Sequence, residues 1–132
     1  MDQPAYLMHR GDALAAYETW PAPAAIISDG AYDLALIAYL QVGPQLRAAV
    51  LAGAAAALRP GGTVFVVGHD LTNLTEGVGG PQDPEVLYSA EAVRAELSGL
   101  RIVRAERVHR TVDRENGPVT AVDTLVRAVR EA

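Results

Sequence analysis

An unbroken run of apolar residues, Leu34 to Tyr39, follows Asp33. A run of this length is typical of a strand buried on both faces, as in parallel sheets. From Pro44 to Leu58 the apolar residues instead recur every three or four positions, which predicts one face of a helix. The pattern therefore predicts a strand followed by a helix.

A turn and a second strand are predicted next. Arg59 to Gly62 contains Pro60, which cannot continue a helix, and two glycines, which adopt positive φ without penalty. Thr63 to Val67 is β-branched or aromatic at each position, which is typical of a strand. A parallel pair joined by a helix is strongly biased to a right-handed crossover. Residues 32–69 are therefore predicted to form one βαβ unit.

A helix and a hairpin are predicted in the last third of the chain. Ser89 is a suitable N-cap for a helix over Ala90 to Leu97. Leu100 to Val112 predicts a strand, and Asn116-Gly117 is a strong turn signal. Alternating residues from Thr120 to Ala128 predict the returning strand. The last two strands should therefore form an antiparallel hairpin.

The longest connection runs from His69 to Leu87 and is rich in glycine and proline. Connections in compact domains are usually about 4 to 6 residues long. A segment of this length is expected to be a lid, a binding loop or a disordered segment.

Composition narrows the class of protein. The chain has 132 residues, a net charge of -5 and no cysteine. This length fits one domain, and we expect residues 1–132 to form a single unit. The acidic balance argues against a general nucleic-acid binder, and the absence of cysteine excludes disulfides. Because no apolar tract approaches the roughly 20 residues of a membrane span and no signal peptide is evident, we expect a soluble, cytoplasmic protein without membrane partners.

The ordered series of elements resembles the C-terminal half of a class I S-adenosylmethionine-dependent methyltransferase. The resemblance covers roughly residues 32–130: strand, helix, proline-glycine-glycine turn, strand, long loop, helix and closing hairpin. It implies an α/β, Rossmann-like fold with a mostly parallel sheet and a C-terminal antiparallel hairpin. It also implies S-adenosylmethionine as the cofactor and a small molecule as the methyl acceptor.

The glycine-rich turn and the ribose-binding acid of that family do not occur before Tyr32. We therefore expect a truncated domain: a shortened chain, a half-domain completed by another chain, or a degenerate relative. Without its usual neighbour, the strand Leu34 to Leu40 would expose an apolar edge. We expect Tyr6 to His9, or a second copy of the chain in a homodimer, to cover this edge.

Ligands of open α/β sheets bind at the carboxyl ends of the strands. After the first strand, the resemblance implies contacts by Ala38, Tyr39 and Leu40 with the cofactor and by Gln41 with the substrate. Core packing is the alternative for Tyr39.

Asp12 and Ala13 stand where a Gly-Asp-Ala sequence follows the third strand of the family. The resemblance implies that Asp12 faces the adenine of the cofactor and that Ala13 offers backbone contacts. A helix cap is the alternative for Asp12.

His69 and Asp70, after the second strand, are the candidate acid–base pair, because a neutral imidazole accepts a proton near pH 7. Adjacent strand residues point to opposite faces, so the two need not form a dyad, and a structural histidine held by the loop is the alternative. Asn73, Gly79 and Gly80 are candidate substrate contacts, or residues that fold over the end of the sheet.

A basic run on the predicted third strand lacks the interleaved aromatic residues of a nucleic-acid surface. Glu106 also interrupts it, which favours a solvated outer strand; its members are Arg101, Arg104, Arg107, His109 and Arg110. No residues have the spacing of metal ligands.

Two functional hypotheses follow. The leading one is methyl transfer from S-adenosylmethionine to a small molecule. The competing one is a non-catalytic partial domain that acts by self-association or partner binding. A fragment of a nucleotide-dependent oxidoreductase is a third interpretation, which the closing hairpin fits poorly.

Overall fold

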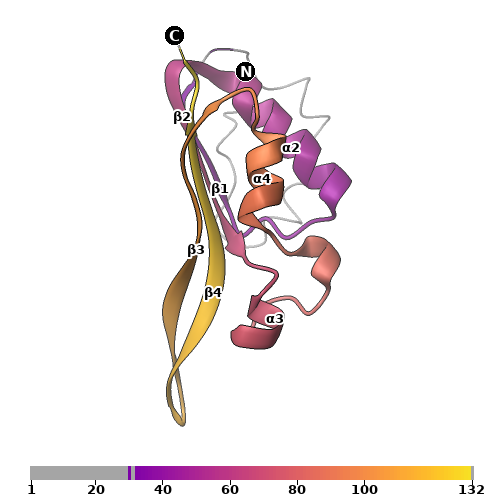
Figure 1. Cartoon of the computed structure of the whole chain (residues 1–132), viewed down its shortest axis with the longest axis vertical. Coiled ribbons are helices and arrows are strands. Elements are labelled where there is room, and N and C mark those ends of the chain that lie inside the picture. Colours follow the sequence, from indigo (N-terminus) through magenta and orange to yellow (C-terminus); the bar gives the residue numbers. More distant parts are fainter. Residues whose placement is uncertain (1–29, 31, 132) are drawn as a thin grey trace, which may run out of the picture.

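The computed structural model describes Gly30 and residues 32–131. The described elements, shown in Figure 1, are β1 (Tyr32–Ala38), α2 (Pro44–Ala57), β2 (Leu58–His69), α3 (Asn73–Glu76), the 3₁₀ turn η2 (Pro84–Val86), α4 (Ala90–Glu96), β3 (Arg101–Arg114) and β4 (Gly117–Val129). The two longer helices and the hairpin predicted from the sequence are thus confirmed to within a few residues. The short helix α3, inside the long loop, was not predicted.

The four described strands form one mixed sheet in the order β1-β2-β4-β3. β1 and β2 are parallel, whereas β4 runs antiparallel to both β2 and β3. The predicted βαβ unit and the closing hairpin at one edge are confirmed. A mostly parallel sheet is not, because the described residues contain only one strand–helix–strand unit and the hairpin adds two antiparallel pairs.

Both longer helices pack on the same face of the sheet (Figure 1). Pro44 stands in the first turn of α2, where its missing N–H costs nothing, and the Ser89 hydroxyl caps α4 by accepting a hydrogen bond from the Ala92 amide at 3.1 Å. The side chain of Arg47 on α2 joins the helices through a 2.7 Å ion pair with Glu96 of α4. The core lies between these helices and the sheet.

β1 is buried on one face only, so the prediction of a strand buried on both faces is wrong. Ala35 and Ile37 are 4% and 1% exposed, whereas Leu34 and Leu36 are 54% and 43% exposed. The cause is the position of the helices, because α2 and α4 cover one face of the sheet and no described helix covers the other. We call these the helix-covered face and the open face.

The predicted proline-glycine-glycine turn lies inside β2 as an irregularity of its pairing with β1. Leu58 pairs with Tyr32, but the next aligned pair is Thr63 with Leu34. Gly61 has a φ of +85°, a conformation that glycine adopts without strain. The extra residues are thus absorbed before the regular parallel ladder begins.

The hairpin extends past the rest of the sheet. Pairing of β2 with β4 ends at His69 opposite Asp123, whereas pairing of β3 with β4 continues to Arg114 opposite Gly117. Residues 109–122 therefore form a two-stranded extension, here called the hairpin arm, which Figure 1 shows beyond the end of β2.

Among the described helices, none has the length and apolar character needed to cross a membrane.

Candidate functional site

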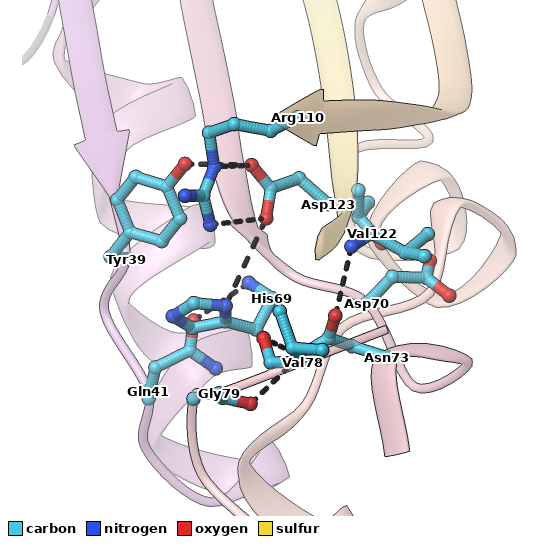
Figure 2. A network of polar contacts seen from close by, with 12 residues as sticks. Tyr39, Gln41, His69, Asp70, Asn73, Val78, Gly79, Arg110, Val122 and Asp123 are labelled. Atoms are coloured by element: carbon cyan, nitrogen blue, oxygen red, sulfur yellow. Dashed lines mark hydrogen bonds and ion pairs between the residues drawn. The ribbon is translucent and has the colours of Figure 1, made fainter. Parts of the chain in front are cut away.

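Four polar side chains meet where β1 and β2 end, and we call them the Asp123 cluster: Tyr39, His69, Arg110 and Asp123 (Figure 2). The Tyr39 hydroxyl donates to Asp123 Oδ2 at 2.7 Å. Arg110 donates from Nε to Oδ2 at 3.0 Å and from Nη2 to Oδ1 at 3.4 Å. His69 Nδ1 lies 3.8 Å from Asp123 Oδ1. Together these groups leave the Asp123 side chain only 3% exposed.

Strand register explains this convergence. Asp123 on β4 is paired with His69 on β2 and with Val108 on β3. Directly paired residues share a face of the sheet, and so does a residue two positions along the strand, such as Arg110. This is the face of Phe65, which pairs with the exposed Leu36. The Asp123 cluster therefore belongs to the open face.

The imidazole of His69 is only partly paired. Its Nδ1 atom is buried and has no hydrogen-bond partner in the described chain. Burial lowers the pKa of His69; the nearby Asp123 carboxylate opposes this effect, and the Arg110 charge adds to it. The imidazole is therefore neutral at pH 7. Because the loop does not hydrogen-bond this ring, the alternative of a structural histidine satisfied by the loop is not supported.

The other ring nitrogen of His69, Nε2, also has no partner among the described residues. Nε2 makes no hydrogen bond to the described residues, and it is not among the buried unpartnered atoms. A neutral imidazole with its Nδ1–H directed at a carboxylate presents a free lone pair on Nε2. A distance of 3.8 Å is too long for a hydrogen bond, but such contacts often tighten when substrate binds.

Tyr39 leaves β1 in an unusual conformation. Its φ is +55°, which is uncommon for a bulky residue and often marks a functional site. The ring lies 5.0 Å from the His69 ring, and the Arg110 guanidinium stands 5.7 Å from its centroid. Burial and the hydrogen bond to Asp123 raise the pKa of Tyr39, so the phenol stays protonated and donates to Asp123.

The Asp70 side chain lies on the helix-covered face, and its carboxylate does not contact the His69 imidazole. Its carboxylate accepts hydrogen bonds from the Thr72 amide and hydroxyl, at 2.9 and 2.6 Å, and from the Thr124 hydroxyl. Arg107 lies 3.3 Å from it. Burial opposes ionisation, but these hydrogen bonds and the Arg107 charge outweigh it and lower the pKa of Asp70. A carboxylate with this many donors stabilises the fold, so the geometry does not favour the predicted acid–base role of Asp70.

Gln41 and Asn73, both predicted to contact substrate, bind the protein itself. The Gln41 amide donates to the Val86 carbonyl at 2.5 Å, and its oxygen accepts from the His69 amide at 2.9 Å. Asn73 is 3% exposed; it donates to the Gly79 carbonyl at 2.9 Å and accepts from the Val122 amide at 2.8 Å. Both therefore position the loop rather than a ligand.

The remaining predicted residues divide into three groups. Leu40 is 2% exposed, and its carbonyl accepts a hydrogen bond from the Tyr88 hydroxyl. Its side chain therefore packs in the core and is not exposed to a cofactor. Ala38 is exposed, and Gly80 lies at the site, since a Cβ there would come within 3.0 Å of His69 Nδ1. Gly79 precedes it on the same segment. Asp12 and Ala13 lie outside the described residues.

Two members of the Asp123 cluster were not predicted. Arg110 was assigned to a solvated basic run, yet it is paired with a buried carboxylate, and Arg107 of the same run is paired with Asp70. Asp123 follows Val122 in an alternating strand, and its position opposite Val108 follows from the hairpin turn. Only its pairing with His69 requires knowledge of the tertiary structure. No three His, Asp or Glu side chains of the described chain gather as a metal site.

Comparison with solved structures identifies the fold. A SAM-dependent methyltransferase from Methanosarcina mazei matches 85% of this chain with a TM-score of 0.58 and 11% identity, and this chain spans 65% of it. The 16S rRNA (adenine(1408)-N(1))-methyltransferase from Catenulisporales acidiphilia, crystallised with its cosubstrate SAM, matches 87% with a TM-score of 0.56 and 17% identity, and this chain spans 58% of it. The protein has a class I methyltransferase-like fold.

This methyltransferase-like chain spans only part of the length of the solved structures it matches. It spans 50% of one further solved structure and 40% of TehB from Haemophilus influenzae. It spans 66% of the N-methyltransferase NodS from Bradyrhizobium japonicum; this match covers 91% of the present chain, with a TM-score of 0.52 and 16% identity. The sequence matches no protein-family model and no curated protein.

SAM is named with two of these solved structures, and the described residues of this chain present an open surface at the carboxyl end of β1. The exposed Ala38 and the Tyr39 ring stand at the carboxyl end of β1, and β1 has no described strand on its outer edge. The buried, unpartnered His69 Nδ1 lies beside them. This end of the sheet therefore combines an open surface with a polar group that has no hydrogen-bond partner. It is also the end where α/β folds bind ligands.

Proposed function

We propose that this protein transfers a methyl group from S-adenosylmethionine to a small-molecule acceptor. One observation carries the proposal: at the carboxyl ends of two parallel strands in a methyltransferase-like fold, the His69 imidazole faces the buried Asp123 carboxylate across 3.8 Å. A perturbed histidine beside a specific charge partner is a physical mark of a reactive site.

The chain's own residues would bind, orient and move a proton. Ala38 and Tyr39 would contact the cofactor, which supplies an electrophilic methyl group on a sulfonium. His69 Nε2 would accept the proton that the acceptor loses, and such proton transfer contributes about 10²–10⁴-fold to a rate. The Asp123 carboxylate would stabilise the resulting imidazolium through Nδ1, as the acid of a catalytic triad does.

Tyr39 and Arg110 would keep that carboxylate in place. Each donates to Asp123 Oδ2, so the carboxylate is held from two sides before any substrate binds. Donors that are already in place before substrate binds give a preorganised site, in which little reorganisation accompanies the reaction. The chemistry thus favours acceptors whose nucleophile carries a proton, namely hydroxyls and amines.

Titration calorimetry with S-adenosylmethionine and S-adenosylhomocysteine tests this function. We expect saturable binding to the wild-type chain and to His69→Gln, because His69 acts on the acceptor. In assays of methyl transfer from labelled S-adenosylmethionine, His69→Gln should lose about 10²–10⁴-fold in rate. Absence of binding by the folded chain at millimolar ligand would contradict the proposal.

A second function, self-association of a non-catalytic partial domain, is favoured by a different observation. Leu34 and Leu36 are exposed on β1, which is an edge strand of the sheet formed by the described residues, and exposed apolar edge strands promote pairing with other chains. A chain that associates with itself but binds neither cofactor nor cofactor product would favour this function over methyl transfer.

A further inference from the structure

The hairpin arm carries arginines toward the Asp123 cluster. Arg110 and Arg114 are four residues apart on β3, in a regular part of its pairing with β4. An even spacing on a strand places both side chains on one face. Arg110 reaches Asp123 from this face, so the Arg114 side chain leaves the arm on the same side as the cluster.

The loop links Arg114 to His69. A Cβ atom on Gly79 would lie 3.0 Å from Nη2 of Arg114, and one on Gly80 would lie 3.0 Å from Nδ1 of His69. Two successive glycines, with φ of +69° and +73°, thus lie against the guanidinium and the imidazole, one against each group. Larger residues could not occupy this segment without displacing one of the two groups.

Some hydrogen-bond donors of Arg110 and Arg114 have no partner among the described residues. Arg110 uses Nε and Nη2 on Asp123, and its Nη1 makes no hydrogen bond within the described chain. Arg114 forms no ion pair with the described residues. By contrast, Arg104, on the same strand, is paired with Glu106. Asp113 lies on the opposite face of β3 from Arg114, so the adjacent carboxylate does not face this guanidinium.

We propose that Arg110 and Arg114 bind an oxyanion group, a carboxylate or phosphate, of the methyl acceptor and so hold its nucleophile beside His69. The inference rests on the proposed function and adds the substrate class: a small acceptor with an anionic group and a hydroxyl or amine to be methylated. Guanidinium groups suit this role because their planar donors match the geometry of oxyanions. Asp123 balances the charge of Arg110, which leaves the charge of Arg114 for the ligand.

The test is a titration of the chain with inorganic phosphate, and separately with acetate, followed by the NMR signals of the Gly79 and Gly80 amides. We expect saturable shifts with the wild-type chain. Arg114→Gln should weaken binding about tenfold, the value of one charge-assisted hydrogen bond of about 1.4 kcal/mol. Arg104→Gln, which removes the same charge from an arginine that already has a partner, should bind like the wild type.

Two outcomes would overturn the inference: no saturable binding of either anion to the wild-type chain, or equal loss in Arg114→Gln and Arg104→Gln. Stronger binding of phosphate than of acetate would assign the acceptor to phosphate esters, and the reverse to carboxylates. Because no methyl donor is present, a chain that binds anions but not S-adenosylmethionine would contradict only the proposed methyl transfer.

Discussion

The two faces of the sheet differ in burial and in how their buried polar groups are hydrogen-bonded. On the helix-covered face, Val64 and Val66 are fully buried under α2 and α4, and the buried carboxylate there, Asp70, accepts three hydrogen bonds. On the open face, Leu34 and Leu36 are exposed, and the buried carboxylate Asp123 lies beside an imidazole nitrogen without a partner. Among the described residues, the only buried side-chain polar atom without a partner, His69 Nδ1, therefore lies on the open face.

This difference shows how one strand end can serve both structure and chemistry. His69 and Asp70 are neighbours in sequence but belong to opposite faces, as do Asp123 and Thr124 on β4. Asp70 and Thr124 hydrogen-bond to each other on the helix-covered face, whereas His69 and Asp123 face each other on the open one. Alternation alone therefore separates the structural aspartate from the candidate functional one.

Substitutions at neighbouring positions of β1 should give the largest difference between the faces. Ile37→Ala empties a site in the core and should lower the free energy of unfolding by about 2–5 kcal/mol. Leu36→Ala removes an exposed side chain and should change it by about 0.5 kcal/mol or less. Urea denaturation of both variants measures this. Equal losses would mean that the open face is covered in solution.

The two aspartates should separate stability from activity. Asp70→Ala leaves the buried Thr124 hydroxyl without its acceptor, so we expect a loss of about 1–3 kcal/mol in stability and an almost unchanged transfer rate for the folded protein. Asp123→Asn keeps the size of the side chain but removes the charge that stabilises the imidazolium, so the transfer rate should fall about tenfold or more. Thermal unfolding and methyl-transfer assays on both variants measure the two effects; the reverse pattern would refute the division.

Much of the fold could be predicted because its signals are local. Pro44, Ser89 and the Asn116-Gly117 turn mark where elements begin or reverse, and each lies within a turn of the structure that it controls. The exposure of Leu34 and Leu36 could not be predicted, because an apolar run shows what a strand could bury and not which helices are present to cover it.

The candidate site was predictable in part for the same reason. His69 and Tyr39 follow strand ends that the apolar pattern locates. The turn also sets Arg110 near Asp123, through the register of one hairpin. The contact of Asp123 with His69 depends on β4 pairing with β2, a long-range choice that no local signal encodes. Adjacency to His69 favours Asp70, whereas alternation directs the Asp70 side chain to the other face.

The smallest expected effect concerns the outer edge of β1, which pairs with no described strand. The homodimer predicted through this edge stays a prediction. If it forms, Leu36→Lys should weaken it, because a charge would lie in an apolar contact. Sedimentation velocity over a range of concentrations measures this. A wild-type chain that remains monomeric throughout would exclude the dimer.

The central claim is that Asp123, and not the adjacent Asp70, is the carboxylate that acts on His69, and the His69 pKa measured by NMR titration tests it most directly. We predict a wild-type pKa below the ordinary value of 6.5, because burial disfavours the charged ring. Asp123→Asn should lower it further, since an opposite charge is lost, and Arg110→Gln should raise it, since a like charge is lost. Asp70→Asn should move it less than either. A pKa of 6.5 or above that does not respond to Asp123→Asn would contradict the account.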